Sequence, residues 1–142
     1  MATNIYQVEG AASWTTGAGT NEVHNRGFVL VHRGKQISFG QDGNPWKDFH
    51  AILEQEAEGI LFVTDIESYY SALLPGEEGS LTLTADKIGA GAGTDVQAVC
   101  SGGLIVPGGK LEVPHGRDAE AEVHFNFVST DGATSPFAWS LV

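Results

Sequence analysis

The stretch Ala119-Glu-Ala-Glu-Val-His-Phe-Asn-Phe-Val128 decides the fold of this chain. Its apolar residues occupy every second position, with polar residues between them. Because successive side chains of a strand point to opposite faces, this alternation predicts a long antiparallel strand with one buried face. The apolar row then completes a core with other strands. The opposite row presents Glu120, Glu122, His124 and Asn126, which either face solvent, meet a neighbouring subunit or line a channel.

Shorter apolar runs predict the other strands of the sheet. Two of them, residues 28–31 and 36–39, flank His32-Arg-Gly-Lys35, which favours a β-hairpin with glycine in its turn. The remaining strands are expected at residues 60–64, 80–85, 96–100, 104–106, 111–113 and 137–142. Ser101-Gly-Gly103 and Pro107-Gly-Gly109 are expected to separate the middle members of this series.

One helix is expected around residues 45–58. Pro45 suits a first helical position, and apolar residues then recur at helical spacing at Trp46, Phe49, Ile52, Leu53 and Ala57. Gly59 is placed to end this helix. Residues 65–74 fit either a short helix or a strand, because Tyr69-Tyr70 suits both.

These patterns predict a mainly β (α+β) fold, an antiparallel β-sandwich or partial barrel with one flanking helix. The 142 residues suit a single domain, which we place at residues 28–142. Residues 1–27 are polar and glycine-rich, with few apolar residues to form a core. We therefore expect this segment to be a flexible arm or loop that orders against a neighbour, or a frayed terminus.

Charge and cysteine content exclude several classes of protein. Seven basic residues against 18 acidic ones give a formal charge of −11, which opposes binding to phosphate backbones or anionic lipid. The single cysteine, Cys100, cannot form an internal disulfide and is expected to be a small buried residue. The first residues show no signal-peptide pattern, and no apolar run is long enough to span a membrane.

No pattern predicts a catalytic residue, a metal ligand or a cofactor. The five histidines occur singly, without the spacing that places two imidazoles around one zinc ion. The serines lack a nucleophile-elbow context. Carboxylate pairs at Glu54/Glu58, Glu77/Glu78 and Glu120/Glu122 are compatible with glycoside cleavage only if a cleft sets their separation, so solvated surface is the expectation.

Six residues are candidates for assembly contacts instead. The aromatic residues Trp14, Tyr69 and Tyr70 are not easily placed in the core by pattern, and such side chains are enriched at protein interfaces. Glu120, Glu122 and His124 join them as members of the polar strand face.

In the order of its predicted elements and in the residue pattern of its strands, the segment 28–142 resembles the tail-tube (major tail) proteins of long-tailed bacteriophages. The resemblance is carried by Ser80-Leu-Thr-Leu-Thr84, Ala98-Val-Cys-Ser-Gly-Gly103 and, above all, the stretch from Ala119 to Gly132. It implies a non-enzymatic β-sandwich or partial barrel that assembles into stacked hexameric rings around a DNA channel.

The resemblance implies a virion protein made in a host cytoplasm, whose partners are other copies of itself and other virion proteins. Sequence-specific nucleic-acid binding and membrane binding are not expected. Two alternatives remain open: another virion component, such as a head decoration or tail-completion protein, and a small β-sandwich module that binds carbohydrate or protein through Trp14, Tyr69 and Tyr70.

Overall fold

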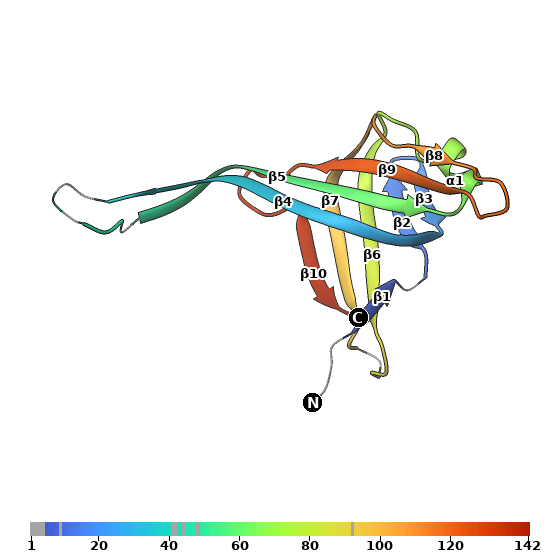
Figure 1. Ribbon diagram of the computed structural model, residues 1–142, viewed down its shortest axis with the longest axis horizontal. Coiled ribbons are helices and arrows are strands. Elements are labelled where there is room, and N and C mark those ends of the chain that lie inside the picture. Colours follow the sequence, from blue (N-terminus) through green and yellow to red (C-terminus); the bar gives the residue numbers. More distant parts are fainter. Residues whose placement is uncertain (1–4, 9, 41–42, 44, 48, 92) are drawn as a thin grey trace.

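The computed structural model describes the chain except for residues 1–4, 9, 41–42, 44, 48 and 92. It is a mainly β structure, as expected, and consists of one antiparallel sheet and one short helix (Figure 1). The elements are β1 (Tyr6–Val8), β2 (Ala12–Thr16), β3 (Gly19–Val23), β4 (Asn25–Phe39), β5 (Phe49–Val63), α1 (Ile66–Ser71), β6 (Glu78–Lys87), β7 (Val96–Val106), β8 (Leu111–Glu112), β9 (Glu120–Phe127) and β10 (Phe137–Leu141).

Strand β9 confirms the alternation read from the sequence. Its apolar residues Ala121, Val123, Phe125 and Phe127 are all buried, whereas the residues between them are partly or fully exposed. It pairs with β5 on one side and with β7 and β8 on the other. The strand therefore lies in the interior of the sheet, with one face on the core.

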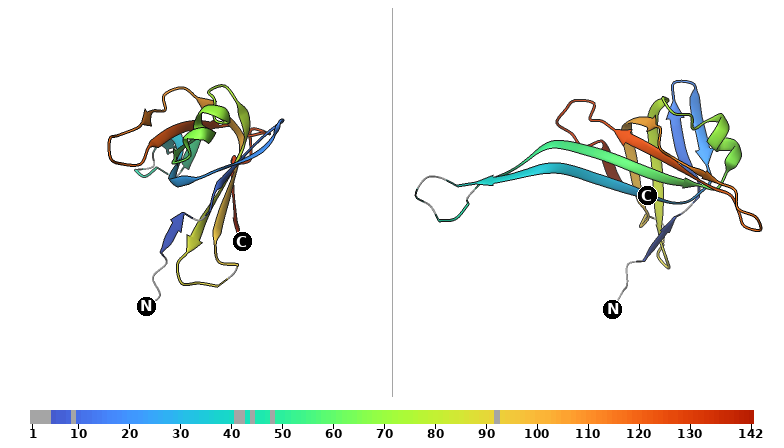
Figure 2. Two further views of the ribbon diagram at one scale, coloured as in Figure 1. Left: turned by 90° about the vertical axis from the view of Figure 1, so that its right-hand side faces the viewer. Right: turned by 45° about the horizontal axis from the view of Figure 1, so that its top comes forward.

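The sheet is rolled so that its two edges approach each other. Its strand order is β3-β2-β6-β7-β9-β5-β4, with β1 beside β6 and β10 beside β7. Strands β3 and β4 lie at opposite ends of this order, yet only His24 separates them in sequence. The amide of Thr64, just after β5, donates to the His24 carbonyl at 3.1 Å. The views in Figure 2 show the resulting curved, partial-barrel body.

The core fills the inside of this curve. Trp14 of β2 packs against Phe125 with ring centroids 5.2 Å apart, and Phe125 stacks on Phe127 at 5.9 Å. Phe137 of β10 meets the edge of Phe127 at 5.5 Å. Buried aliphatic residues from β5, β6 and β7 surround this aromatic row. Strands distant in sequence are thus held together by one apolar cluster.

The helix predicted at residues 45–58 is wrong. Residues 49–58 belong instead to β5, which pairs with β4 along its length. Trp46, expected on the buried helix face, is 80% exposed in the connection between these strands. The helical spacing of the apolar residues was coincidental, because the first half of β5 has no core beneath it and so no two-residue alternation to keep.

The predicted hairpin turn at residues 32–35 is also wrong, because β4 is one strand of 15 residues. The glycine marks a bulge instead of a turn. Arg33 pairs with Glu56 and Lys35 with Leu53, so Gly34 faces two residues of β5. One of them, Glu54, has a left-handed φ of 53°, unusual for a residue with a Cβ.

Strands 96–100 and 104–106 are likewise one continuous strand, β7. Its glycines permit close packing. A Cβ on Gly103 would lie 3.1 Å from the Phe127 ring, and Gly102 has a φ of 61° where the Val128 backbone approaches. The strands expected at residues 80–85, 111–113 and 137–142 are confirmed with small shifts in their bounds, whereas the one expected at residues 60–64 is only the last part of the much longer β5.

The amino-terminal segment is more ordered than the arm or loop we expected, although residues 1–4 and 9 lie outside the described part. Strands β2 and β3 form a hairpin joined to β6. Ala12, Trp14 and Val23 are buried. Between the alternatives for residues 65–74, the structure has helix α1 at Ile66–Ser71.

Candidate functional site

A cavity of about 350 Å³ lies beside α1 and brings together four of the six candidate residues. Tyr69 and Tyr70 come from the helix, and Glu122 and His124 from β9. Leu73, Leu74 and Pro75, which follow the helix, supply apolar surface. The rest of the lining is Ile105, Val106, Pro107, Gly108, Gly109 and Val123. The site is therefore a mainly apolar and aromatic hollow with one carboxylate and one imidazole.

The helix that carries the two tyrosines is fixed at its first turn by Asp65. The Ser68 hydroxyl donates to one carboxylate oxygen at 2.8 Å, and the Ser68 amide donates to the other at 3.4 Å. These bonds cap the helix and lower the pKa of Asp65, with the Ser68 hydroxyl the main cause. Tyr69 packs against the core, whereas Tyr70 is 63% exposed.

The segment after the helix is tied to β7. The Gly76 amide donates to the Ile105 carbonyl at 2.7 Å, and the Ile105 amide donates to the Glu77 carbonyl at 3.0 Å. Leu73 is only 2% exposed and joins the core, whereas Leu74 is 45% exposed. Both walls of the cavity are therefore held by backbone hydrogen bonds, so the hollow is largely preformed.

The polar wall consists of neighbouring side chains on β9. The His124 Nε2 atom lies 3.7 Å from a carboxylate oxygen of Glu122, which is too long for a hydrogen bond. In the described part of the chain this nitrogen is buried without a hydrogen-bond partner. The Glu122 side chain keeps 29% of its surface exposed. It can accept a hydrogen bond from a group that enters the cavity.

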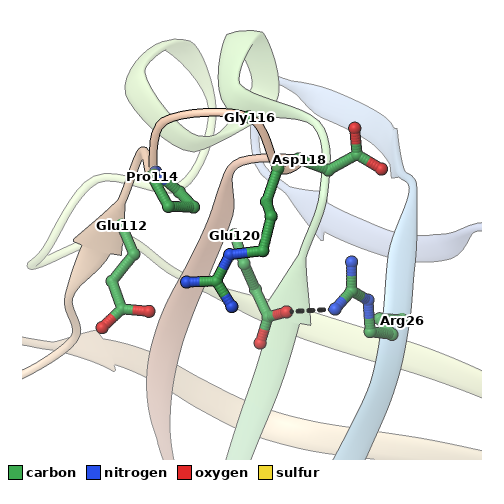
Figure 3. Close-up of a pocket in the computed structure, with 7 residues that line it drawn as sticks. Arg26, Glu112, Pro114, Gly116, Asp118 and Glu120 are labelled. Atoms are coloured by element: carbon green, nitrogen blue, oxygen red, sulfur yellow. Dashed lines mark ion pairs between the residues drawn. The ribbon is translucent and has the colours of Figure 1, made fainter.

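Glu120 lies elsewhere, in a second hollow of about 410 Å³ (Figure 3). Its carboxylate pairs with the Arg26 guanidinium at 2.8 Å, which links β9 to β4. Glu112 and Asp118 also line this hollow. Because the Arg26 side chain is 58% exposed, the ion pair contributes at most about 1 kcal/mol. Glu120 therefore joins a surface charge cluster instead of the α1 cavity.

Trp14 is not a surface residue, contrary to its interpretation as an interface candidate. Its side chain is 0% exposed and packs on Phe125 in the core. Its indole Nε1 has no hydrogen-bond partner among the described residues. An isolated tryptophan in a polar segment was misleading because β2 lies between β3 and β6, where it inserts one large side chain into the core. One of the three aromatic platforms of the binding-module alternative is thereby removed.

The surface that the sequence did not reveal is the long hairpin of β4 and β5. Pairing between β5 and β9 ends at Ala57, so β4 is the only partner of residues 49–56 among the strands that the structure describes. We call residues 33–56 the projecting hairpin (Figure 1). Its described residues include large apolar side chains that are about half exposed or more: Phe39, Trp46, Ile52 and Leu53. The only signal for this hairpin in the sequence would have been two strand-like segments joined by one connection.

The base of the projecting hairpin adjoins a loop ordered by Asp131. One carboxylate oxygen accepts from the amides of Ala133 at 2.8 Å and Thr134 at 2.7 Å, and the other from the Thr134 hydroxyl at 2.8 Å. These donors hold the pKa of Asp131 far below its ordinary value. A broad hollow of about 880 Å³ is lined by this loop on one side and by the last residues of the hairpin, 52–56, on the other.

The described residues form neither a metal site nor a reactive thiol site at these surfaces. No group of three or more histidine, cysteine, aspartate or glutamate side chains in the described ranges is placed to hold a metal ion. Cys100 is buried, and desolvation raises its pKa to about 12, so its reactive thiolate form is scarce. Within the part of the chain that is described, no helix has the length and hydropathy to cross a membrane.

No protein-family model matches this chain, and none of the curated proteins compared with it is similar in sequence. What the cavity and the projecting hairpin can bind therefore has to be argued from their own geometry.

Proposed function

We propose that this chain is a non-enzymatic structural protein of a virion, which assembles through its projecting hairpin into the stacked rings of a phage-like tail tube around DNA. The observation that carries the proposal is the hairpin itself. Over Arg33–Phe39 it extends beyond the body by roughly 20 Å, at about 3.3 Å per residue. A two-stranded ribbon without a third strand is only marginally stable in water, so this one calls for a partner.

The side chains on the ribbon support a protein partner. Ile52 is 58% exposed and Leu53 is 48% exposed, and as successive strand residues they point to opposite faces. Both faces of the ribbon therefore present apolar surface to water. Such a surface is typical of a segment that becomes buried when subunits associate.

Unpaired strand edges offer further places for association. Strand β10 pairs only with β7, and β4 only with β5, in the described sheet. On β10, Trp139 is 58% exposed and Leu141 is 68% exposed. An apolar edge is a template for pairing with another chain. Contacts between unlike surfaces of identical subunits generate closed rings when the rotation between subunits closes.

The charge of the chain supports passage of DNA without adhesion. A ring built from subunits of formal charge −11 repels the phosphate backbone unless basic residues gather on its inner face. The polar row of β9, including Glu122 and His124, remains the candidate for a channel lining or a subunit contact.

The experiment is to purify the full chain and measure its mass by sedimentation while imaging it by negative-stain electron microscopy. We expect rings or tubes of uniform diameter. A protein that stays monomeric at high concentration and shows neither rings nor tubes would overturn the proposal.

A matched pair of variants tests the role of the projecting hairpin. Ile52→Ser combined with Leu53→Ser should abolish assembly and leave the far-ultraviolet circular dichroism of the body unchanged. Ile88→Ser, which changes an equally apolar and 50% exposed residue in the β6–β7 connection, should assemble normally. Normal assembly of the hairpin variant would contradict the role of the projecting hairpin, on which the proposal rests.

A further inference from the structure

We propose that the α1 cavity of one subunit receives Trp46 from the projecting hairpin of the next subunit. The inference rests on the proposed self-assembly and names its contact. Trp46 lies in the connection between β4 and β5 and is 80% exposed, the largest exposed fraction of any large apolar side chain described. A tryptophan held in water at the end of an arm is poorly explained by the fold of one subunit.

The geometry requires a second copy. The β4–β5 connection and α1 lie at opposite ends of the molecule (Figure 1). The hairpin of a subunit therefore cannot deliver Trp46 to the cavity of the same subunit. A head-to-tail contact between two copies satisfies both surfaces, and it is a contact between unlike patches of the kind that builds rings or filaments.

The cavity has the size and chemistry for an indole. A cavity of about 150 Å³ already holds a benzene ring in a protein interior. The α1 cavity measures about 350 Å³ and presents Tyr69, Tyr70, Leu74 and Pro75 as aromatic and apolar walls. A buried indole N–H needs an acceptor, and the Glu122 carboxylate, which also lines the cavity, provides one.

The distribution of charge favours this pairing over a contact between two bodies. Residues 35–53 contain two lysines and two aspartates and are formally neutral, so the rest of the chain holds the entire charge of −11. A neutral hairpin end can approach an acidic body without the repulsion that two bodies experience.

A local charge match adds to this argument. Lys47 follows Trp46 and has no carboxylate partner among the described residues. Glu67, Glu77 and Glu78 lie on or beside the segments that frame the cavity. Lys110, which follows the lining residue Gly109 in sequence, is already paired with Glu112 at 3.3 Å. The cavity rim therefore offers Lys47 an acidic surface.

Disulfide trapping between two single-cysteine variants tests the contact while keeping the indole and both tyrosines. Lys47→Cys is mixed with Leu74→Cys, whose site is on the cavity rim, and the mixture is oxidised under assembly conditions. Lys47→Cys mixed with Ile88→Cys is the matched control, because the β6–β7 connection lies away from α1 (Figure 1). Native Cys100 is 0% exposed and does not compete.

We expect a cross-linked dimer at least about tenfold more abundant in the cavity mixture than in the control. Rings that form normally but cross-link equally in both mixtures would overturn this inference and leave the proposed assembly standing. Equal cross-linking is also the outcome if a small ligand or another protein occupies the cavity. Absence of any assembly would overturn both proposals.

Substitution of the indole gives a second, independent measurement. Trp46→Ala should raise the protein concentration needed for assembly by about tenfold or more, as expected for a central aromatic contact. Trp46→Phe keeps a ring but removes the N–H donor, and should have a smaller effect. The control is Tyr6→Ala, which removes an exposed aromatic ring from β1, a strand outside the proposed contacts. An equal or larger effect of Tyr6→Ala would contradict the assignment of Trp46 to the cavity.

Discussion

The rolled body and the projecting hairpin use the same strand in opposite ways. In its second half, β5 lies between β4 and β9 and alternates buried Ala57, Leu61 and Val63 with partly exposed residues. In its first half, the described side chains from Ile52 to Glu56 are all exposed. One continuous strand thus contributes to the core of the subunit at one end and exposes its side chains to solvent at the other. Burial, and not strand pairing alone, separates the two regions.

The largest contrast should appear on truncating one side chain in each region. Phe125→Ala removes a ring that touches both Trp14 and Phe127, so it should lower the free energy of unfolding by about 3–5 kcal/mol. Leu53→Ala in the hairpin should cost less than about 1 kcal/mol in the monomer. Urea unfolding followed by circular dichroism, under conditions that keep the protein monomeric, measures both. Similar losses would mean that the hairpin is stabilised within one subunit.

Hydrogen exchange sharpens the boundary between the two regions. In the monomer, backbone amides of residues 35–39 and 50–53 should exchange at least about a hundredfold faster than those of β9 or β7, because two strands open locally at low cost. Assembly should slow exchange in the hairpin and leave the slow exchange of the β9 and β7 amides almost unchanged. Mass spectrometry of peptides from monomer and rings provides the measurement. A hairpin already protected in the monomer would contradict our account of it.

A smaller effect is expected at the bulge where the two regions meet. Glu54 occupies a left-handed conformation that costs a residue with a Cβ about 1–2 kcal/mol, whereas glycine adopts it freely. Part of that gain is offset by the entropy that glycine loses on folding, so Glu54→Gly should stabilise the monomer by up to about 1 kcal/mol. Glu56→Gly, at an ordinary strand position, should instead destabilise it. The same urea titration compares the two signs.

The smallest effect concerns the Asp131 loop at the base of the hairpin. Since the pKa of Asp131 is depressed in the folded protein, its ordering of the loop is complete above the ordinary value of 3.8 and is lost as pH falls through the lower folded value. Amide resonances of Ala133 and Thr134 should keep their folded positions as pH is lowered through 3.8. In Asp131→Asn the loss of loop order at still lower pH should disappear, because the asparagine side chain does not titrate. Loss of the wild-type signals already near pH 4 would contradict the hydrogen-bonded carboxylate.

The regions also differ in how well the sequence predicts them. Alternation along residues 119–128 predicted β9 because one face of that strand touches the core at every second residue. The same logic failed for residues 45–58, where no core imposes a period and chance spacing resembles a helix. The prediction that Trp14 lies at an interface was wrong for the opposite reason. It is the single large contribution of β2 to a core built by distant strands, and no local pattern surrounds it.

Glycine was the second source of error. Gly34 and the pair Gly102-Gly103 suggested turns, but they lie within long strands, at a bulge and at close contacts with β9 and the residue after it. These contacts depend on partners far away in sequence. For the candidate site, aromatic character indicated Tyr69 and Tyr70, and strand alternation indicated Glu122 and His124. That the four residues share one cavity followed only from the packing of α1 near β9.

The sheet order has a consequence for the growing polypeptide. Strands β4 and β5 are neighbours in sequence and can pair as soon as both have left the ribosome, whereas β2 must wait for β6, and β5 for β9. Non-local pairings of this kind form slowly. The apolar hairpin would therefore be present before the body that carries it has closed. Newly made chains that meet through their hairpins at that stage would associate before they had folded. A lower concentration of newly made chains should accordingly increase the yield of correctly folded subunits.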